Sequence, residues 1–184
     1  MITIEPTAGL EATLSRSGLT SFLNRARAAV GVSGEVEVLL SDDPTLRRLN
    51  KSFRGKNKST DVLSFPTPAE IAQAQAGDLA ISLETAARHA AAHGHPLTDE
   101  VKILLLHGLL HLSGEDHETD NGEMAAREAT LRRELRLPAT LIERTTTSPS
   151  KKPSSTTKKP SSTTTKPSPR RIPSTTQSKK RGRR

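Results

Sequence analysis

The stretch HGLLHLSGEDH, residues 107–117, contains three of the six histidines in this chain of 184 residues. His107 and His111 are four residues apart, about 400° of rotation on a helix, so both imidazoles leave the same face one turn apart. Residues 101–112 are almost unbrokenly apolar, which predicts a buried helix. Gly114, just past that helix, favours a left-handed turn that brings His117 back toward the pair.

Three imidazoles that converge from a helix and its following turn make a nitrogen site with one coordination position left open. Catalytic zinc is held in this way, whereas structural zinc is usually closed by a fourth protein ligand. The alternative is that His107 and His111 are core histidines that bond to their neighbours. The third histidine behind a glycine turn favours the metal. We therefore predict one zinc ion per chain at His107, His111 and His117.

The same spacing, HxxxHxxGxxH, occurs in one class of zinc proteases. Those enzymes place a glutamate directly after the first histidine, where it acts as the general base. Gly108 occupies that position here, so peptide hydrolysis lacks its base and a protease is disfavoured. Glycine within a helix costs about 1 kcal/mol relative to alanine, which indicates that another group approaches the backbone closely at Gly108.

A second HxxxH pair, His89 and His93, falls in a helix that we predict to begin after Ser82 and to end at Gly94. Both histidines lie off the apolar stripe of that helix. No glycine turn returns a third histidine to them in the pattern of the first pair. We interpret His89 and His93 as surface histidines.

The remainder of residues 1–144 alternates between short strand patterns and amphipathic helix patterns. The predicted strands are residues 2–5, 35–41, 62–65 and 79–82. The predicted helices begin at Thr20 or Ser21, Asp43-Pro44, Ser82, Thr98, and Thr119 or Asp120. The pattern indicates one domain with a core of aliphatic residues, because the chain has three Phe and no Trp or Tyr.

The formal net charge of +8 is divided unevenly along the chain. Residues 145–184 contain 12 Lys or Arg and no acidic residue, which leaves −4 for residues 1–144. This tail contains KKPSSTT twice in succession and lacks the apolar residues that offset chain entropy, so we predict a folded domain over 1–144 and a disordered basic tail over 145–184. The tail either attracts RNA phosphates non-specifically or is a solubilising extension.

Several classes of protein are excluded or disfavoured by composition. The chain has no cysteine, which excludes disulfides and thiolate ligands and is compatible with a reducing cytoplasm. The N-terminal residues MITIEPTAGL lack a basic segment followed by an apolar run, and residues 101–112 are too short and too rich in histidine to span a bilayer. We expect a cytoplasmic protein that is not associated with a membrane.

The segment FRGKNKSTDVLSFP, residues 53–66, joins a basic loop that contains glycine to a short strand. Arg54, Lys56 and Lys58 belong either to an ordinary solvated loop or to a phosphate-binding one. Charge alone does not decide between them.

Three segments together resemble the bacterial YbeY family of metal-dependent endoribonucleases, which mature ribosomal RNA: NKSFRGKNKSTDVLSFP (50–66), GDLAIS (77–82) and HGLLHLSGEDH (107–117). The resemblance spans about residues 30–137, and further matches are Gly94-His95, Met124 and Glu128. Phe53 departs from the family by lacking the usual hydroxyl, and Asn57 stands where an acidic residue is common. The repetitive tail lies outside the family pattern.

This resemblance implies an α/β fold in which a small mixed sheet of four strands is flanked by about five helices. It implies zinc at the three histidines and a functionally important, catalytic arginine at Arg54. From the basic loop itself, we expect Lys56 and Lys58 to contact nucleic acid together with Arg54. The implied function is zinc-dependent cleavage of single-stranded RNA during 3′-end maturation of small-subunit ribosomal RNA and ribosome quality control. The implied partners are ribosomal RNA and the small ribosomal subunit, with no small-molecule cofactor.

The residues themselves are compatible with that chemistry. A zinc ion can activate water for attack on phosphorus and stabilise charge on phosphoryl oxygens, and the planar guanidinium of Arg54 suits a phosphate better than a lysine would. The general base stays open among Glu115, Asp116, a second zinc-bound water and the 2′-hydroxyl of the RNA. The competing hypothesis is a non-catalytic ribosome assembly factor with a structural metal, which binds ribosomal RNA or a ribosomal protein through its basic loop and tail.

Overall fold

The computed structural model describes residues 1–68, 74–117 and 119–138. Within these residues one mixed sheet has the strand order β1-β2-β4-β3. The strands are β1 (Ile2–Ile4), β2 (Glu35–Ser41), β3 (Val62–Pro66) and β4 (Gln75–Ser82). Strands β1, β2 and β4 are parallel, and β3 is antiparallel to β4.

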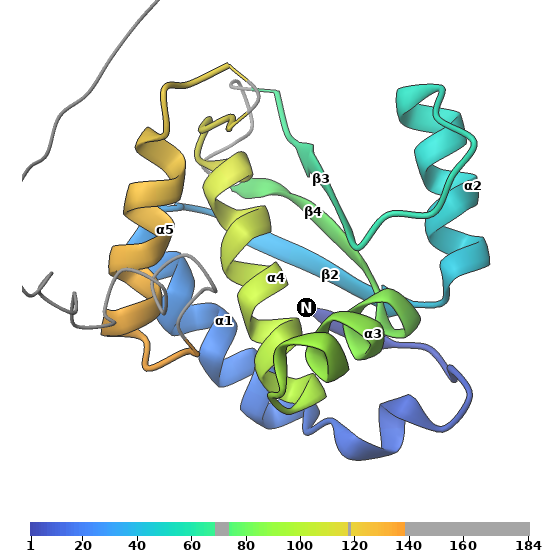
Figure 1. Ribbon diagram of the computed structural model, residues 1–184. Helices are drawn as coiled ribbons and strands as arrows, with labels where there is room; N and C mark the ends of the chain where they lie inside the picture. Colours follow the sequence, from blue (N-terminus) through green and yellow to red (C-terminus); the bar gives the residue numbers. More distant parts are fainter. Residues whose placement is uncertain (69–73, 118, 139–184) are drawn as a thin grey trace, which may run out of the picture. The chain divides into compact units, whose positions relative to one another are not determined.

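Five α-helices and one short 3-10 helix, η1 (Leu10–Thr13), accompany the sheet in the described part of the chain. The α-helices are α1 (Arg16–Val30), α2 (Asp43–Arg54), α3 (Leu83–His93), α4 (Leu97–Leu112) and α5 (Glu123–Glu134). The predicted α/β fold, with a mixed four-stranded sheet and about five helices, is confirmed (Figure 1).

Two cores of unequal size lie on the two faces of the sheet, because successive strand residues point to opposite sides. In β2, Val38 and Leu40 are buried in the large core with α1, α3, α4 and α5, whereas Leu39 borders the small one. In the small core Leu46 of α2 packs against Leu63 and Ala80. Figure 1 accordingly shows α2 standing apart from the other helices.

Helix α4 is the central element of the large core. Its buried apolar residues are Val101, Ile103, Leu104, Leu105, Leu106, Leu109 and Leu110. A helix that is apolar on most of its circumference is stable only when neighbours surround it. Here α1, α3 and α5 contact α4, and β3 and β4 lie beneath it.

At Gly108 the backbone of α4 lies close against the sheet. A Cβ atom added there would lie 2.7 Å from Cδ2 of Leu79 and 3.4 Å from Oγ of Ser64. The close approach predicted from a glycine within this helix is therefore present, and the approaching group is β4. The side of α4 that faces the sheet has no room for the glutamate of the zinc proteases.

Two predicted element starts were too late in the sequence. Helix α1 begins at Arg16, because Oγ of Ser15 caps it by accepting a hydrogen bond from Gly18 N at 3.2 Å. The fully buried Leu19 already belongs to its apolar stripe. Strand β4 begins at Gln75 rather than residue 79, since Gly77 already pairs with Val36 of β2 and with Pro66 of β3.

The last helix begins later than predicted. Helix α5 starts at Glu123, and the carboxylate of Asp120 accepts hydrogen bonds from the backbone N–H groups of Gly122 at 2.9 Å and Met124 at 2.7 Å. Asp120, three residues before α5, thus stabilises the start of the helix. Its two carboxylate oxygens accept hydrogen bonds from N–H groups that lack helical acceptors.

The predicted domain boundary at residue 144 and the predicted disorder of residues 145–184 lie outside the described residues. Over the described ranges, no helix combines the length and the apolar character needed to cross a membrane.

Candidate metal centre

The structure brings His107, His111 and His117 together at the C-terminal end of α4. The ring centroids of His107 and His111 are 4.8 Å apart, and that of His117 lies 5.2 Å and 5.1 Å from them. One ligand atom from each residue can be chosen so that all lie within 4.8 Å of one another. Gly114 has a φ of +94°, so the expected left-handed turn is what returns His117 to the helix.

The outer nitrogens of two rings face hydrogen-bond acceptors. Nδ1 of His107 lies 2.9 Å from Oε2 of Glu128, and Nδ1 of His111 lies 2.9 Å from the backbone oxygen of Glu115. A carboxylate and a carbonyl only accept, so each Nδ1 carries the proton and donates it. The tautomers inferred in this way leave both Nε2 atoms with lone pairs.

The two Nε2 atoms lie 3.2 Å apart. Two lone pairs at this distance repel each other, and a cation between them removes the repulsion. Two nitrogens bound tetrahedrally to zinc at the usual bond length are about 3.3 Å apart. The donor set and its spacing therefore fit a zinc-type ion.

The protonation of His111 also suits a metal ligand. Burial is the largest cause that lowers the pKa of His111, and the nearby His107 charge lowers it further, while the hydrogen bond to Glu115 acts in the opposite direction. The neutral imidazole, which is the form that binds a metal, is favoured as a result.

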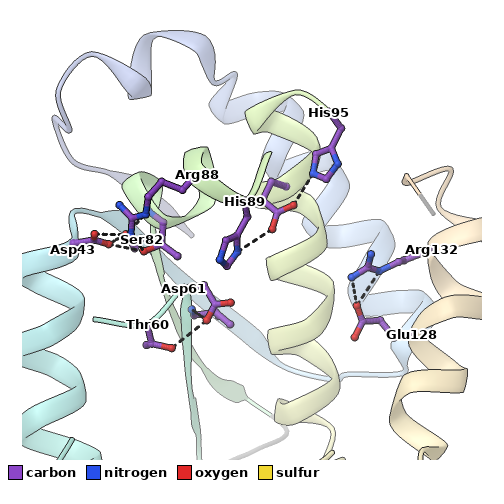
Figure 2. Close-up of polar contacts among 12 residues, drawn as sticks. Asp43, Thr60, Asp61, Ser82, Arg88, His89, His95, Glu128 and Arg132 are labelled. Atoms are coloured by element: carbon purple, nitrogen blue, oxygen red, sulfur yellow. Dashed lines mark hydrogen bonds and ion pairs between the residues drawn. The ribbon is translucent and has the colours of Figure 1, made fainter. Parts of the chain in front are cut away.

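Glu128 supports the site from α5. Its side chain is 11% exposed and also accepts a hydrogen bond from Nε of Arg132 at 2.9 Å, a contact drawn in Figure 2. Burial, the largest influence, raises the pKa of Glu128, but the hydrogen bond from His107 and the charge of Arg132 hold that pKa below its ordinary value. The carboxylate therefore stays ionised and can orient His107.

Sequence reasoning noted Glu128 only through the family resemblance and assigned it no role. A local signal was available, because Glu128 and Arg132 are four residues apart on the helix stripe that also carries Met124. An acidic residue on a buried stripe needs a partner. Nothing in the spacing indicated that His107, 21 residues away in sequence, would be that partner.

The two carboxylates considered as general base differ in their surroundings. The carboxylate of Glu115 is engaged by Arg127 and by Oγ of Ser113, the latter at 3.1 Å. Asp116 is exposed in the turn that precedes His117. Its negative charge acts on His111, for which it raises the pKa slightly against the stronger lowering causes.

Arg54, Lys56 and Lys58 do not lie on the same element as the histidines. All three are exposed, at the end of α2 and in the loop that follows it. Both α2 and α4 contact β3, and in Figure 1 their C-terminal ends lie at the same end of the sheet with β3 between them. An extended ligand would have to cross β3 to reach both the histidines and Arg54.

The second HxxxH pair is more than a surface feature. His93 is half-buried, and the structure places it with His95 and the buried Glu100 in another group whose ligand atoms lie within 4.8 Å of one another. His89, the other histidine of that pair, does not belong to this group, and its side chain is 41% exposed. The spacing of the first pair does not recur here, but the Gly94 turn places His95 beside His93.

Comparison with known proteins adds a family likeness to this geometry. The family model described as "Endoribonuclease YbeY" matches residues 9–136. The endoribonuclease YbeY of Koribacter versatilis is 53% identical over 139 residues, which cover 76% of this chain and 89% of that protein. The endoribonuclease YbeY of Solibacter usitatus is 46% identical over 133 residues, or 72% and 88% of the two chains.

A solved structure shares the fold. The solution structure of a Thermotoga maritima protein matches with a TM-score of 0.51 and 24% sequence identity, over 84% of this chain and 99% of that one. At this level of identity the likeness concerns the architecture of the sheet and its helices.

Proposed function

The chain belongs to the YbeY family of endoribonucleases, and on that premise we propose that it cleaves single-stranded RNA with a zinc ion held by His107, His111 and His117. The observation that carries the proposal is the pair of Nε2 atoms, 3.2 Å apart. Their lone pairs point at a shared space because Glu128 and the backbone of Glu115 hold the opposite sides of the rings.

The zinc would supply a water of lowered pKa and a positive charge that stabilises phosphoryl oxygens. The residues of the chain do the positioning. Glu128 holds His107 in one orientation and one tautomer, and the Gly114 turn delivers His117. The site is composed of neutral imidazoles, so the full charge of the ion is available to the phosphate.

Arg54 is proposed to bind a substrate phosphate. Its guanidinium offers paired N–H donors that match two phosphate oxygens, and Lys56 and Lys58 extend the positive surface into the loop that follows α2. In support of this proposal, Arg54 is exposed at the end of α2, and Lys56 and Lys58 are exposed in the loop that follows. A single-stranded RNA that crosses β3 would have one phosphate at Arg54 and another at the histidines.

Glu115 and Asp116 are the two protein carboxylates near the histidines that we propose as candidates for the general base. The carboxylate of Glu115 is held by Arg127 and Ser113, and abstracting a proton would require it to give up these partners. Asp116 lies one residue from His117 and is exposed. The 2′-hydroxyl of the RNA and a second water are the alternatives to a carboxylate.

The finer biological role is part of the same proposal. We propose that the substrate is the 3′ end of small-subunit ribosomal RNA, in maturation and quality control of the small ribosomal subunit in the cytoplasm. The basic segment 145–184 would increase the affinity for RNA, and the catalytic residues all belong to the domain predicted over 1–144.

The decisive experiment compares metal content and RNA cleavage in the same preparations. His107→Ala, His111→Ala and His117→Ala should each abolish cleavage of a single-stranded RNA, and chelation of the wild-type protein should do the same until zinc is restored. His89→Ala, a histidine substitution outside the triad, should leave cleavage intact. Ribosomal RNA binding without cleavage in any metal state would favour the non-catalytic assembly factor instead.

A further inference from the structure

A second group of metal-ligating side chains lies at the other end of α4 from the three histidines. His93 ends α3, His95 follows in the turn, and Glu100 lies in the first turns of α4. One ligand atom from each lies within 4.8 Å of the others. We propose that His93, His95 and Glu100 form a second site for a divalent metal of the zinc type, independent of the proposed RNA cleavage.

The buried carboxylate of Glu100 lies next to two imidazoles, those of His89 and His95. Its side chain is 6% exposed, with Oε2 2.6 Å from Nε2 of His95 and Oε1 3.5 Å from Nδ1 of His89. Figure 2 labels the two histidines, His89 on α3 and His95 in the turn after it. A buried negative charge requires a positive counterpart nearby. A divalent cation bound beside Glu100 would supply that counterpart.

His95 has bonding capacity that the protein does not use. Its side chain is 9% exposed, and its Nδ1 atom is buried with no hydrogen-bond partner among the described residues. In the absence of metal, one proton lies between Nε2 and the carboxylate of Glu100. An ion that replaces this proton would bind Nε2 and Glu100 together, and the unused Nδ1 could then carry the proton of the imidazole.

His93 gives the ion access to the group. Its ring lies 5.8 Å from that of His95, at an interplanar angle of 19°, and 6.4 Å from that of His89 one turn earlier on α3. His93 is half-buried, so its ring can rotate toward the buried pair. Two ligand atoms bound tetrahedrally to zinc are about 3.3 Å apart, so rotation of the His93 ring would bring ligand atoms that now lie within 4.8 Å of one another to bonding positions.

The donors define the kind of ion. Two imidazoles and one carboxylate are the ligands of zinc and neighbouring first-row divalent metals, whereas magnesium and calcium prefer sites made of oxygen. The site would join the end of α3 to the beginning of α4. It would therefore act as a structural clamp at the start of the helix that carries His107 and His111.

The test is the zinc stoichiometry of the full-length protein without a histidine tag. After removal of metal with a chelator, titration with zinc chloride followed by calorimetry should show two zinc ions per chain. The double variant His107→Ala/His111→Ala should retain one, and His93→Ala should also retain one. Combining these three substitutions should remove both. His93→Ala should preserve RNA cleavage once the first site is filled.

Further variants separate metal binding from folding. Glu100→Gln keeps the shape and a hydrogen-bond acceptor but lacks the charge, so it should lose the second zinc while its circular dichroism stays unchanged. Lys102→Ala, a neighbouring substitution on α4, should keep both ions. When cobalt replaces zinc, the visible absorption spectrum of the wild-type protein should differ from that of His93→Ala. Saturation of the wild-type protein at one zinc, or two ions bound to His93→Ala, would overturn the proposal.

Discussion

Nδ1 of His107 donates a hydrogen bond to Oε2 of Glu128 across 2.9 Å, so a side chain of α5 fixes the orientation of a ring on α4. Glu128 is held in turn by Arg132 on the same helix. The helix itself is anchored by the buried Met124 and Leu131. The geometry of the candidate metal centre therefore depends on how α5 packs against α4, as well as on the spacing of the histidines.

Substitution of Glu128 should weaken metal binding although Glu128 is not a ligand. Glu128→Ala removes both the acceptor and the charge, so zinc affinity should fall by about 10- to 100-fold. Glu128→Gln can still accept from Nδ1 and should lose less. The measurement is competition with a chromophoric chelator, with Glu134→Gln, an exposed position on α5, as control. Equal affinity in Glu128→Ala and the wild-type protein would contradict the positioning role.

Introducing the protease glutamate at position 108 should damage the fold without creating peptide hydrolysis. Gly108→Glu forces a carboxylate against Leu79 and Ser64, where a Cβ alone already comes within 2.7 Å. Overpacking and burial of a charge together should cost more than about 3 kcal/mol of unfolding free energy. Ala125→Glu, exposed on α5, should change it by less than about 0.5 kcal/mol. Urea denaturation distinguishes the two, and a stable Gly108→Glu protein would show that α4 can move off the sheet.

Arg54 should be needed for RNA cleavage but not for folding or for metal binding. Arg54→Ala should lower kcat/KM by about 100-fold, the loss expected for one donor to transition-state charge. Arg54→Lys should recover only part of it, because an ammonium lacks the paired donors. Arg48→Ala, exposed on the same helix, is the matched control. Unfolding of Arg54→Ala would instead mark the arginine as structural.

Because of Asp43, the free energy of unfolding should depend on pH in the acidic range. Burial, the largest influence, raises its pKa, but hydrogen bonds from Ser82, Thr85, Arg88 and Ser59 together lower that pKa from 3.8 to about 2, and Figure 2 shows the contacts to Ser82 and Arg88. A carboxyl with a lowered pKa stabilises the fold above its unfolded pKa, and this contribution is lost as pH falls through the folded pKa.

Asp43→Asn should therefore unfold at lower urea concentration than the wild-type protein at neutral pH. The difference should shrink as the pH falls from 3.8 toward about 2, the two pKa values that bound the titration. The measurement is urea unfolding of both proteins over a series of pH values. A difference that stays constant through this window would show that the charge of Asp43 does not contribute.

The basic segment after residue 144 should account for most non-specific attraction to RNA. Truncation to residues 1–144 removes a charge of +12, so RNA binding at low salt should weaken and its dependence on salt should flatten. The cleaved bond and turnover at saturating RNA should not change, because the proposed site residues lie before the cut. An unchanged salt slope would assign the segment another role. Loss of cleavage with zinc still bound would place it in catalysis.

Local patterns predicted the elements of the fold better than their arrangement. The alternation of Val36, Val38 and Leu40 predicted β2 with the observed bounds, because pleating makes burial alternate within one strand. The pattern contains no information about the strand order β1-β2-β4-β3, since that order depends on how segments far apart in sequence cross over. The early start of β4 was missed because only pairing with two neighbouring strands shows Gly77 to be part of the sheet.

By itself, the sequence determined that three histidines can share one ion. Helical periodicity and a glycine turn are local properties, and His107, His111 and His117 fall within eleven consecutive residues. Only the tertiary structure decided which groups hold those rings, because Glu128 approaches His107 through the packing of α5 on α4. The same reason applies to Gly108, whose close neighbour Leu79 belongs to β4, and to Glu100, which meets His95 once α4 folds back on α3. Contacts between elements depend on the packing of buried surfaces, which no local spacing specifies.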